Sequence, residues 1–251
     1  MDACVSVSSR RRSCACGFGD CCAADPNRAL FESALHVLAP VLDELVFVGG
    51  CTTGLFITDP AAAGIRPTMD VDAIVDVASY AKYAALGERL RALGLAEDST
   101  PGAPLCRWRR ENLIVDIMPV NEHSLGFSNR WYPSAIETAQ TVDIGGHVAR
   151  VVTPALFMAT KLDAFHGRGG DDIVASHDLE DIIAVVDGRP QIVGEVAAAP
   201  TDVRSYIAFE LRALLGNHDF LEALGGFLLP DAASQGRRGG LHARLRLMAQ
   251  S

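Results

Sequence analysis

The sequence predicts an α+β fold, in which a mixed β-sheet flanked by helices is followed by a helical C-terminal portion. Between residues 45 and 152, short runs rich in Val and Ile are separated by polar segments, as expected for buried strands. Turn signals such as Gly145-Gly146 lie between several of these runs. After Thr153, the apolar residues recur at helical spacing instead. Strands first and most helices afterwards are typical of the α+β class.

The expected elements of the first half follow from the length of each apolar run and from the residues that stop it. In chain order they are a helix over 27–42, a strand over 44–50, a helix or turn over 51–59, a loop over 61–68, a strand over 69–77, a helix over 79–94, two strands within 104–119 that are joined by a tight turn at Glu111 and Asn112, and a hairpin over 141–152.

Capping residues define the expected helices of the second half. Thr153 can cap a helix whose first residue is Pro154. Ser176 can cap a second helix, which has acids in its first turn and ends at Gly188. Two further amphipathic stretches predict helices over 201–216 and 241–249.

These patterns divide the chain into a tail (1–25), a core (26–152) and a helical portion (153–251). The tail holds five of the seven cysteines, at spacings that do not match a zinc site: Cys4, Cys14, Cys16, Cys21 and Cys22. Since the tail has no apolar period to bury, we expect it to be disordered and dispensable for folding.

The composition excludes several classes of protein. The chain has 251 residues and a net charge of −9, which argues against a general affinity for nucleic acid. No apolar run reaches the roughly 18 residues that a membrane span needs. The N-terminus lacks the apolar segment of a secretory signal. We therefore expect a cytoplasmic protein without a membrane partner.

Three aspartates indicate a metal site. Asp70 and Asp72 lie two residues apart in an apolar segment, so they share a face if that segment is a strand. Two unpaired carboxylates repel each other unless a cation bridges them, and magnesium prefers such oxygen ligands. Asp116 lies inside a second apolar strand, "LIVDIMP". If the two strands are neighbours, the three acids converge and can hold two metal ions.

A glycine pair beside these acids predicts a phosphate site. Gly49 and Gly50 end the strand "VFV", and the absence of a Cβ lets the backbone approach a phosphate closely. If a helix begins there, its free N–H groups face the phosphates. The hydroxyls of Thr52 and Thr53 are further donors. A Gly-Gly pair can also be a plain turn, so the combination with the acids carries the prediction.

The combined pattern resembles the polymerase-β-type nucleotidyltransferase superfamily, and is closest to the AbiEii-type enzymes of abortive-infection and toxin–antitoxin systems. The residues that carry this resemblance are "VGGCTTGL" (48–55), "RPTMDVDAIV" (66–75) and "LIVDIMP" (113–119), with a weaker match over 160–182. The resemblance spans roughly residues 30 to 190. The spacing from Gly50 to Asp70 is longer than in the shortest members of the superfamily.

The resemblance implies an activity and roles for the acids. The chain would move a nucleoside monophosphate from an NTP to a hydroxyl acceptor, with Asp70 and Asp72 binding two magnesium ions. Asp116 would complete the metal site and help to activate the acceptor. The acceptor stays open between a tRNA end, a protein side chain and a small molecule such as an aminoglycoside. A toxin of this type would also have a cognate antitoxin as partner.

The resemblance also implies how the triphosphate is held. Gly49, Gly50 and Thr52 would cradle the β- and γ-phosphates, and Lys161 would neutralise charge from the following helix. A solvated helix lysine is the alternative for Lys161. Arg168 and Asp178 are weaker candidates, for which a salt bridge or a cap is the simpler interpretation.

Two alternatives remain. The same fold can serve as a non-catalytic nucleotide-binding or interaction protein, which metal-dependent NTP binding would distinguish from an enzyme. An aminoglycoside-type acceptor would suit the acidic chain, because such a substrate is polycationic.

Two basic clusters can either hold a nucleic-acid strand or form solvated faces. The first is Arg107, Arg109 and Arg110 around Trp108, and the second is Arg237, Arg238, Arg244 and Arg246.

Overall fold

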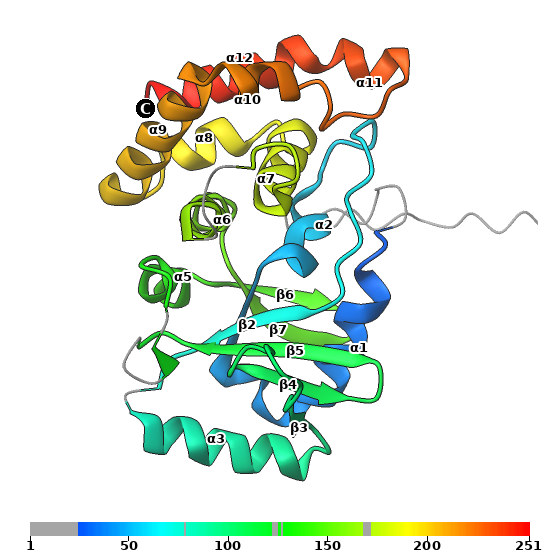
Figure 1. The fold of residues 1–251 in the computed structure, drawn as a ribbon, viewed down its shortest axis with the longest axis vertical. Helices are drawn as coiled ribbons and strands as arrows, with labels where there is room; N and C mark the ends of the chain where they lie inside the picture. The colour runs from blue at the N-terminus through cyan, green and yellow to red at the C-terminus, as the bar shows by residue number, and fades with distance from the viewer. Residues whose placement is uncertain (1–24, 78, 122–124, 127, 168–171) are drawn as a thin grey trace, which may run out of the picture.

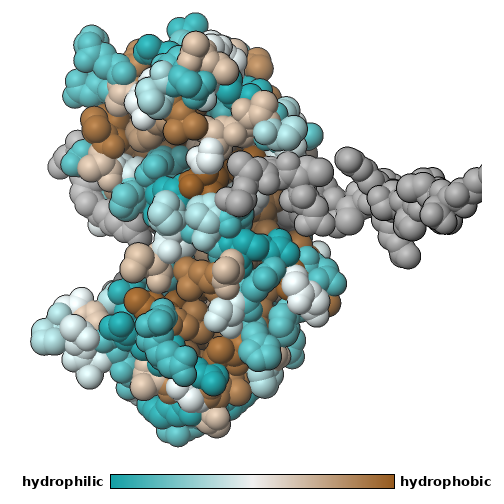
Figure 2. All heavy atoms as spheres, turned by 90° about the vertical axis from the view of Figure 1, so that its right-hand side faces the viewer, coloured by the Kyte–Doolittle hydropathy of each residue, from teal (hydrophilic) through white to brown (hydrophobic). Residues whose placement is uncertain are grey.

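The computed structural model describes residues 25–251 except 78, 122–124, 127 and 168–171. The predicted tail, apart from its last residue, and the weak candidate Arg168 therefore lie outside the described residues. Figure 1 shows a sheet portion in the lower half of the view and a stack of helices above it. In Figure 2, the outline narrows on one side between these two portions. Hydrophilic and apolar residues are interspersed over the face shown there.

The sheet has seven strands in the order β3-β4-β5-β2-β1-β7-β6. The pairs β2–β5 and β1–β7 are parallel, and the other pairs are antiparallel. The sheet is therefore mixed, as predicted. The strands are β1 (Leu45–Val48), β2 (Val71–Val75), β3 (Ala96–Glu97), β4 (Arg107–Arg110), β5 (Leu113–Pro119), β6 (Gln140–Ile144) and β7 (His147–Val151).

The central strands are covered on both faces, which explains their apolar runs. All four residues of β1 are buried, and so are four of the five residues of β2. A strand buried on both faces reads as a continuous run and not as an alternation. The edge strand β6 shows the opposite pattern, since only Val142 and Ile144 are buried. The predicted turns are also confirmed, with Glu111 at φ 54° between β4 and β5 and both Gly145 and Gly146 at positive φ between β6 and β7.

The helices of the first half frame the sheet. Helix α1 (Arg28–Leu38) buries Phe31, Ala34, Leu35 and Leu38 and continues into the 3-10 turn η1 (Ala39–Glu44). After β1 come η2 (Gly50–Thr52) and the short helix α2 (Thr53–Phe56). Helix α3 (Tyr80–Ala92) lies beside β3 and β4 at the bottom of Figure 1.

The second half is helical from Pro154 onwards, as predicted. Its central helix, α6, is buried on most of its sides and packs against α7 and α9, while α12 covers α7, α8 and α9. These helices, with α5 before them, are α5 (Tyr132–Glu137), α6 (Pro154–Gly167), α7 (His177–Gly188), α8 (Ile192–Ala197), α9 (Thr201–Gly216), α10 (His218–Ala223), α11 (Ala232–Gly236) and α12 (Arg238–Ala249). No helix in the described part of the chain has the length and apolar character needed to cross a membrane.

Some short elements were not predicted. They are the two-residue strand β3 and the five- or six-residue helices α5, α8, α10 and α11. Helices this short are not stable alone, because nucleation is unfavourable, and they depend on packing that no local pattern reports.

The loop between α2 and β2 carries residues of the candidate site, and Asn27 holds it in place. The Asn27 side chain, which is 1% exposed, donates to the carbonyl of Arg66 (3.0 Å) and accepts from the N–H of Thr68 (2.8 Å). One amide group thus satisfies two backbone groups of a loop that lacks secondary structure. The start of α1 therefore fixes the path of the chain into β2.

We expect Asn27→Ala to lower the free energy of unfolding by about 1–3 kcal/mol, since two partly buried backbone groups lose their partner. Urea denaturation followed by circular dichroism measures the change. Gln140→Ala, at an exposed position of the edge strand, is the control and should leave stability unchanged. Equal midpoints for the two variants would contradict the role of Asn27.

Candidate functional site

The sheet brings the predicted aspartates together. In the parallel pairing of β2 with β5, Asp72 lies opposite Asp116, and in the antiparallel pairing of β2 with β1 it lies opposite Val48. Residues that face each other across neighbouring strands point to the same side of the sheet. Asp70 lies one residue before the first residue of β2. The predicted adjacency of the two strands is therefore confirmed, although Asp70 precedes its strand.

An arginine lies between two of these acids. The guanidinium of Arg107 donates to both oxygens of Asp116, from Nε to Oδ1 at 2.8 Å and from Nη2 to Oδ2 at 2.7 Å. The same Nη2 donates to Oδ2 of Asp70 at 2.9 Å. The hydrogen bonds to Asp116 raise the pKa of Arg107 further above its ordinary value, so the guanidinium stays charged. A protein cation therefore bridges the two carboxylates.

Sequence reasoning missed this bridge, although the signal was present. A two-residue turn at Glu111 and Asn112 pairs Arg110 with Leu113, and therefore Arg107 with Asp116. The sequence analysis groups Arg107 with Arg109 and Arg110 in the first basic cluster instead.

The glycine turn is shaped around Asp72. Gly49 has φ 73° and ψ −167°, a region of backbone conformation that is almost restricted to glycine. A Cβ on Gly49 would overlap the Asp72 carboxylate. On Gly50 it would lie 2.8 Å from Nη2 of Arg66 and 3.4 Å from Oδ2 of Asp181. Because Gly49 and Gly50 have no side chains, the charged groups of Asp72, Arg66 and Asp181 can lie directly against this turn.

The threonines after the turn face inward. The hydroxyl of Thr52 donates to the carbonyl of Gly49 (2.8 Å), and both Thr52 and Thr53 are fully buried. The Thr53 hydroxyl has no hydrogen-bond partner among the described residues. Thr52 thus stabilises the turn, and a contact of either hydroxyl with a phosphate stays a prediction. Cys51 is fully buried, which raises the pKa of its thiol and keeps it in the unreactive neutral form.

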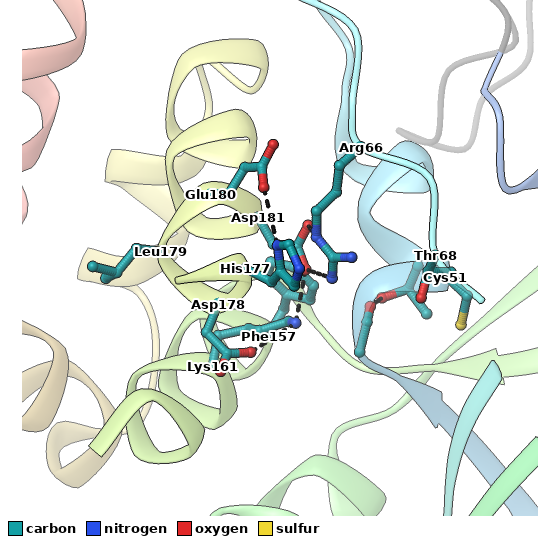
Figure 3. A network of polar contacts seen from close by, with 12 residues as sticks. Cys51, Arg66, Thr68, Phe157, Lys161, His177, Asp178, Leu179, Glu180 and Asp181 are labelled. Atoms are coloured by element: carbon teal, nitrogen blue, oxygen red, sulfur yellow. Dashed lines mark hydrogen bonds and ion pairs between the residues drawn. The ribbon is translucent and has the colours of Figure 1, made fainter. Parts of the chain in front are cut away.

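Four charged side chains form a network next to the glycine turn (Figure 3). Arg66 binds Asp181 through two hydrogen bonds, of 3.0 Å from Nε and 2.9 Å from Nη2. Nζ of Lys161 lies 2.7 Å from Oδ2 of Asp181 and 3.0 Å from Oδ1 of Asp178. Arg66 belongs to the loop before β2, whereas the other three residues belong to α6 and α7. The network therefore joins the sheet portion to the helical portion.

Lys161 is buried, which excludes the solvated alternative. Its exposed fraction is 7%. Burial alone would lower the pKa of Lys161, but the charges of Asp181 and Asp178 outweigh it, so the pKa lies above its ordinary value. The ammonium therefore remains charged. Asp178, for which a salt bridge or a cap was the simpler interpretation, is a salt-bridge partner. Arg66 and Asp181 lie in the segments that carry the resemblance, but the sequence analysis gives them no role.

A small cavity connects several of these groups. Its volume is about 70 Å³, and Gly49, Asp72, Lys161 and Asp178 all line it. The remaining wall includes Asn129, which is fixed by its hydrogen bonds to the carbonyl of Thr160 and the N–H of Trp131. The structure thus places the glycine turn, one of the three predicted metal ligands and the lysine around a single space.

The predicted basic clusters do not form a stacking surface. Trp108 is 2% exposed, so its ring is not available to a base. Arg109 contacts Asp98 at 3.5 Å, and Arg110 donates to the carbonyl of Leu93. In the second cluster the partners are also internal, with Arg237 bound to Asp59 and Asp187, and Arg238 and Arg244 bound to backbone carbonyls. Stacking of a base on Trp108 is therefore excluded, and binding of a nucleic-acid strand by either cluster stays a prediction.

Asp70, Asp72 and Asp116 are suitable ligands for magnesium by residue type, but their side chains are not arranged as a metal site. Carboxylate oxygens are the ligands that magnesium prefers, and the turn at Gly49 leaves room for the carboxylate of Asp72. Among the described residues, however, no three His, Cys, Asp or Glu side chains are grouped to hold a metal ion. A metal shared by Asp70 and Asp116 would need the position that the Arg107 guanidinium has. The magnesium site therefore stays a prediction.

No protein-family model matches the chain, and no curated protein matches it. Among solved structures, the chain is similar to an antigenic nucleotidyltransferase-like protein from Paracoccidioides brasiliensis. The TM-score is 0.46 and the identity 16%, over 90% of this chain and 94% of that chain. This is a distant likeness of chain path. Membership of the AbiEii-type group stays a prediction.

We expect Gly49→Ala to destabilise the protein, because the new methyl group meets Asp72 and the backbone strain costs about 1–3 kcal/mol. Thermal and urea unfolding measure the loss. Gly64→Ala is the matched control, since a Cβ at Gly64 meets no atom within 4 Å and its φ is not in the left-handed region. A Gly49→Ala variant as stable as Gly64→Ala would show that the turn does not need glycine.

We expect Lys161→Met to cost about 3–5 kcal/mol, because two buried carboxylates lose their cation. Lys161→Arg should keep part of the stability. The raised pKa means that the contribution of Lys161 is fully present below its unfolded value of 10.5 and is lost only as pH rises through the folded value. The loss in Lys161→Met, measured by urea unfolding, should therefore be constant between about pH 6 and pH 9. Lys82→Met, at an exposed position of α3, should change little, and equal effects at the two lysines would contradict the network.

Proposed function

We propose that the chain is a magnesium-dependent nucleotidyltransferase, which moves a nucleoside monophosphate from an NTP to a hydroxyl acceptor. One observation carries the proposal. The register of β2 and β5 sets Asp72 opposite Asp116, directly beside a glycine turn that contacts Asp72. Carboxylates beside an open backbone turn are the combination that phosphoryl transfer needs, because the metal and the phosphates must meet.

In this proposal, Asp70, Asp72 and Asp116 would hold two magnesium ions. Bound magnesium would neutralise phosphate charge and lower the pKa of an acceptor hydroxyl. The acceptor oxygen forms a bond to the α-phosphorus, and the bond from that phosphorus to the bridging oxygen breaks, so that pyrophosphate leaves. Asp116 would help to remove the acceptor proton.

The chain supplies two cations for the triphosphate. Arg66 lies against Gly50, and Lys161 lines the same cavity as Gly49 and Asp72. Asp178 and Asp181 hold both cations in place, which limits the entropy lost when a phosphate binds. A preorganised cation next to the leaving pyrophosphate would stabilise the charge that develops there.

The acceptor is the least constrained part of the proposal. Several arginines of the two basic clusters contact groups of the chain itself, and the net charge of −9 favours a cationic acceptor such as an aminoglycoside. A tRNA end and a protein side chain remain alternatives. A role as a toxin with a cognate antitoxin rests on the resemblance of the motifs.

A second function has one observation in its favour. The Arg107 bridge satisfies Asp70 and Asp116 without a metal, as it would in a non-catalytic protein that keeps the fold. Such a protein would bind NTP without metal, or not at all, and would transfer nothing.

We expect the purified chain with magnesium to transfer label from one α-labelled NTP to RNA, protein or a small molecule of a cell extract, which separation of the three fractions identifies. Asp70→Asn and Asp116→Asn should each reduce transfer at least about a hundredfold, because the metal loses a charged ligand. Asp143→Asn, on the edge strand β6, is the control and should retain activity. Transfer that survives in both site variants would contradict the metal role of these acids.

A further inference from the structure

The Arg107 bridge uses carboxylate oxygens that a metal ion would need. Both oxygens of Asp116 accept from Arg107, and so does Oδ2 of Asp70. The other oxygen of Asp70, Oδ1, accepts from the hydroxyl of Thr68 at 3.0 Å. Every oxygen of these two acids therefore has a donor from the chain itself.

The bridge also balances charge in a compact space. Asp70 and Asp116 bind the same guanidinium and Asp72 lies opposite Asp116 in the sheet, so the like charges of these carboxylates disfavour ionisation. One guanidinium that binds two of them compensates part of this charge, and the two-pronged contact with Asp116 is the strongest geometry available to an arginine. Arg107 thus supplies a counter-charge for Asp70 and Asp116 from within the chain.

We propose that Arg107 competes with the metal for Asp70 and Asp116, so that the metal binds only when the Arg107 side chain moves away. This inference rests on the proposed function, because it assumes that these acids bind a metal. The guanidinium and the metal cannot share the position between the two carboxylates. Arg107 is therefore a gate for metal loading.

The surroundings of Arg107 allow this movement. Its side chain is 23% exposed. Strand β4 lies near one edge of the sheet, with only the two-residue strand β3 beyond it. A long side chain at this place can turn outwards without a change in the backbone. The released guanidinium remains close to the site, where phosphates of an incoming NTP would attract it.

The gate predicts that metal binds weakly to the free protein and better with NTP. Without NTP, the metal must replace a bidentate ion pair and leave the guanidinium without a partner. With NTP, the phosphates both ligate the metal and accept the released guanidinium. Metal and nucleotide would therefore bind cooperatively, and the cooperativity would depend on Arg107.

Manganese binding to the full chain tests the gate without any need for catalysis. The loss of the free Mn²⁺ signal in electron paramagnetic resonance gives the affinity in the absence of NTP. We expect Arg107→Gln to bind Mn²⁺ about tenfold more tightly than wild type, as expected when charge-assisted hydrogen bonds no longer compete. In EDTA the variant should melt below wild type, and Mn²⁺ should raise its melting temperature by more.

Two further variants define the origin of the effect. Arg109→Gln, two residues along β4, removes the same charge from an arginine that contacts Asp98, and should bind Mn²⁺ like wild type. Arg107→Gln combined with Asp116→Asn should lose the gain in affinity. If Arg107→Gln does not fold, Arg107→Lys keeps the charge but not the planar fork, and should still bind Mn²⁺ more tightly than wild type.

The outcomes separate the gate from the proposed function. Equal or weaker Mn²⁺ binding in the folded Arg107 variants would overturn the gate and leave the metal-dependent function standing. A gain that Arg109→Gln reproduces would also overturn it, because the effect would then be general electrostatics. No Mn²⁺ binding to wild type or to either Arg107 variant, with or without NTP, would overturn the gate and the function together.

Discussion

The register between β2 and β5 is the constraint on which the rest of the site depends. Parallel pairing sets Asp72 beside Asp116, while the antiparallel neighbour β1 sets Val48 on the other side of Asp72 and delivers the glycine turn to the same point. A slip of one residue would turn an aspartate to the opposite face and into the core. Val115 and Ile117 alternate with Asp116 and are buried. They disfavour such a slip, because it would move both apolar side chains out of the core.

Charge compensation within the chain then gives the site its present form. The sheet portion supplies the acids and Arg107, and the loop before β2 supplies Arg66. The helical portion supplies Lys161 and its two aspartates. Because Arg66 binds Asp181 across the boundary, the two portions meet at the site itself. The ion pair between Lys161 and Asp178 lines the cavity beside Gly49. In the proposed function, a phosphate that binds Lys161 there would compete with Asp178.

Much of this architecture could be predicted from sequence, for identifiable reasons. The strands are apolar because both faces are covered, and the site acids stood out against that background, as did Gly49 and Gly50. The sequence also predicts the tight turn at Glu111 and Asn112. This turn alone implies the register in which Arg107 lies opposite Asp116. What could not be predicted depends on contacts between distant segments, such as the burial of Trp108 and the hold of Asp181 on Arg66. A single charged residue belongs to no periodic pattern in the sequence, so its ion-pair partner can be identified only in the folded structure.

The arginine bridge bears on how an acidic site survives without its ligand. Metal-binding carboxylates must be close enough to share an ion, and this closeness is costly whenever the ion is absent. If Asp70 and Asp116 bind a metal as proposed, Arg107 on the neighbouring strand β4 removes this cost through its hydrogen bonds and adds another, because it would have to leave before the ion binds. In a catalytic protein the bridge therefore lowers the affinity for metal until nucleotide arrives. In a non-catalytic protein the same contact would be permanent. The two cases have one resting geometry and differ only in whether the guanidinium can be displaced.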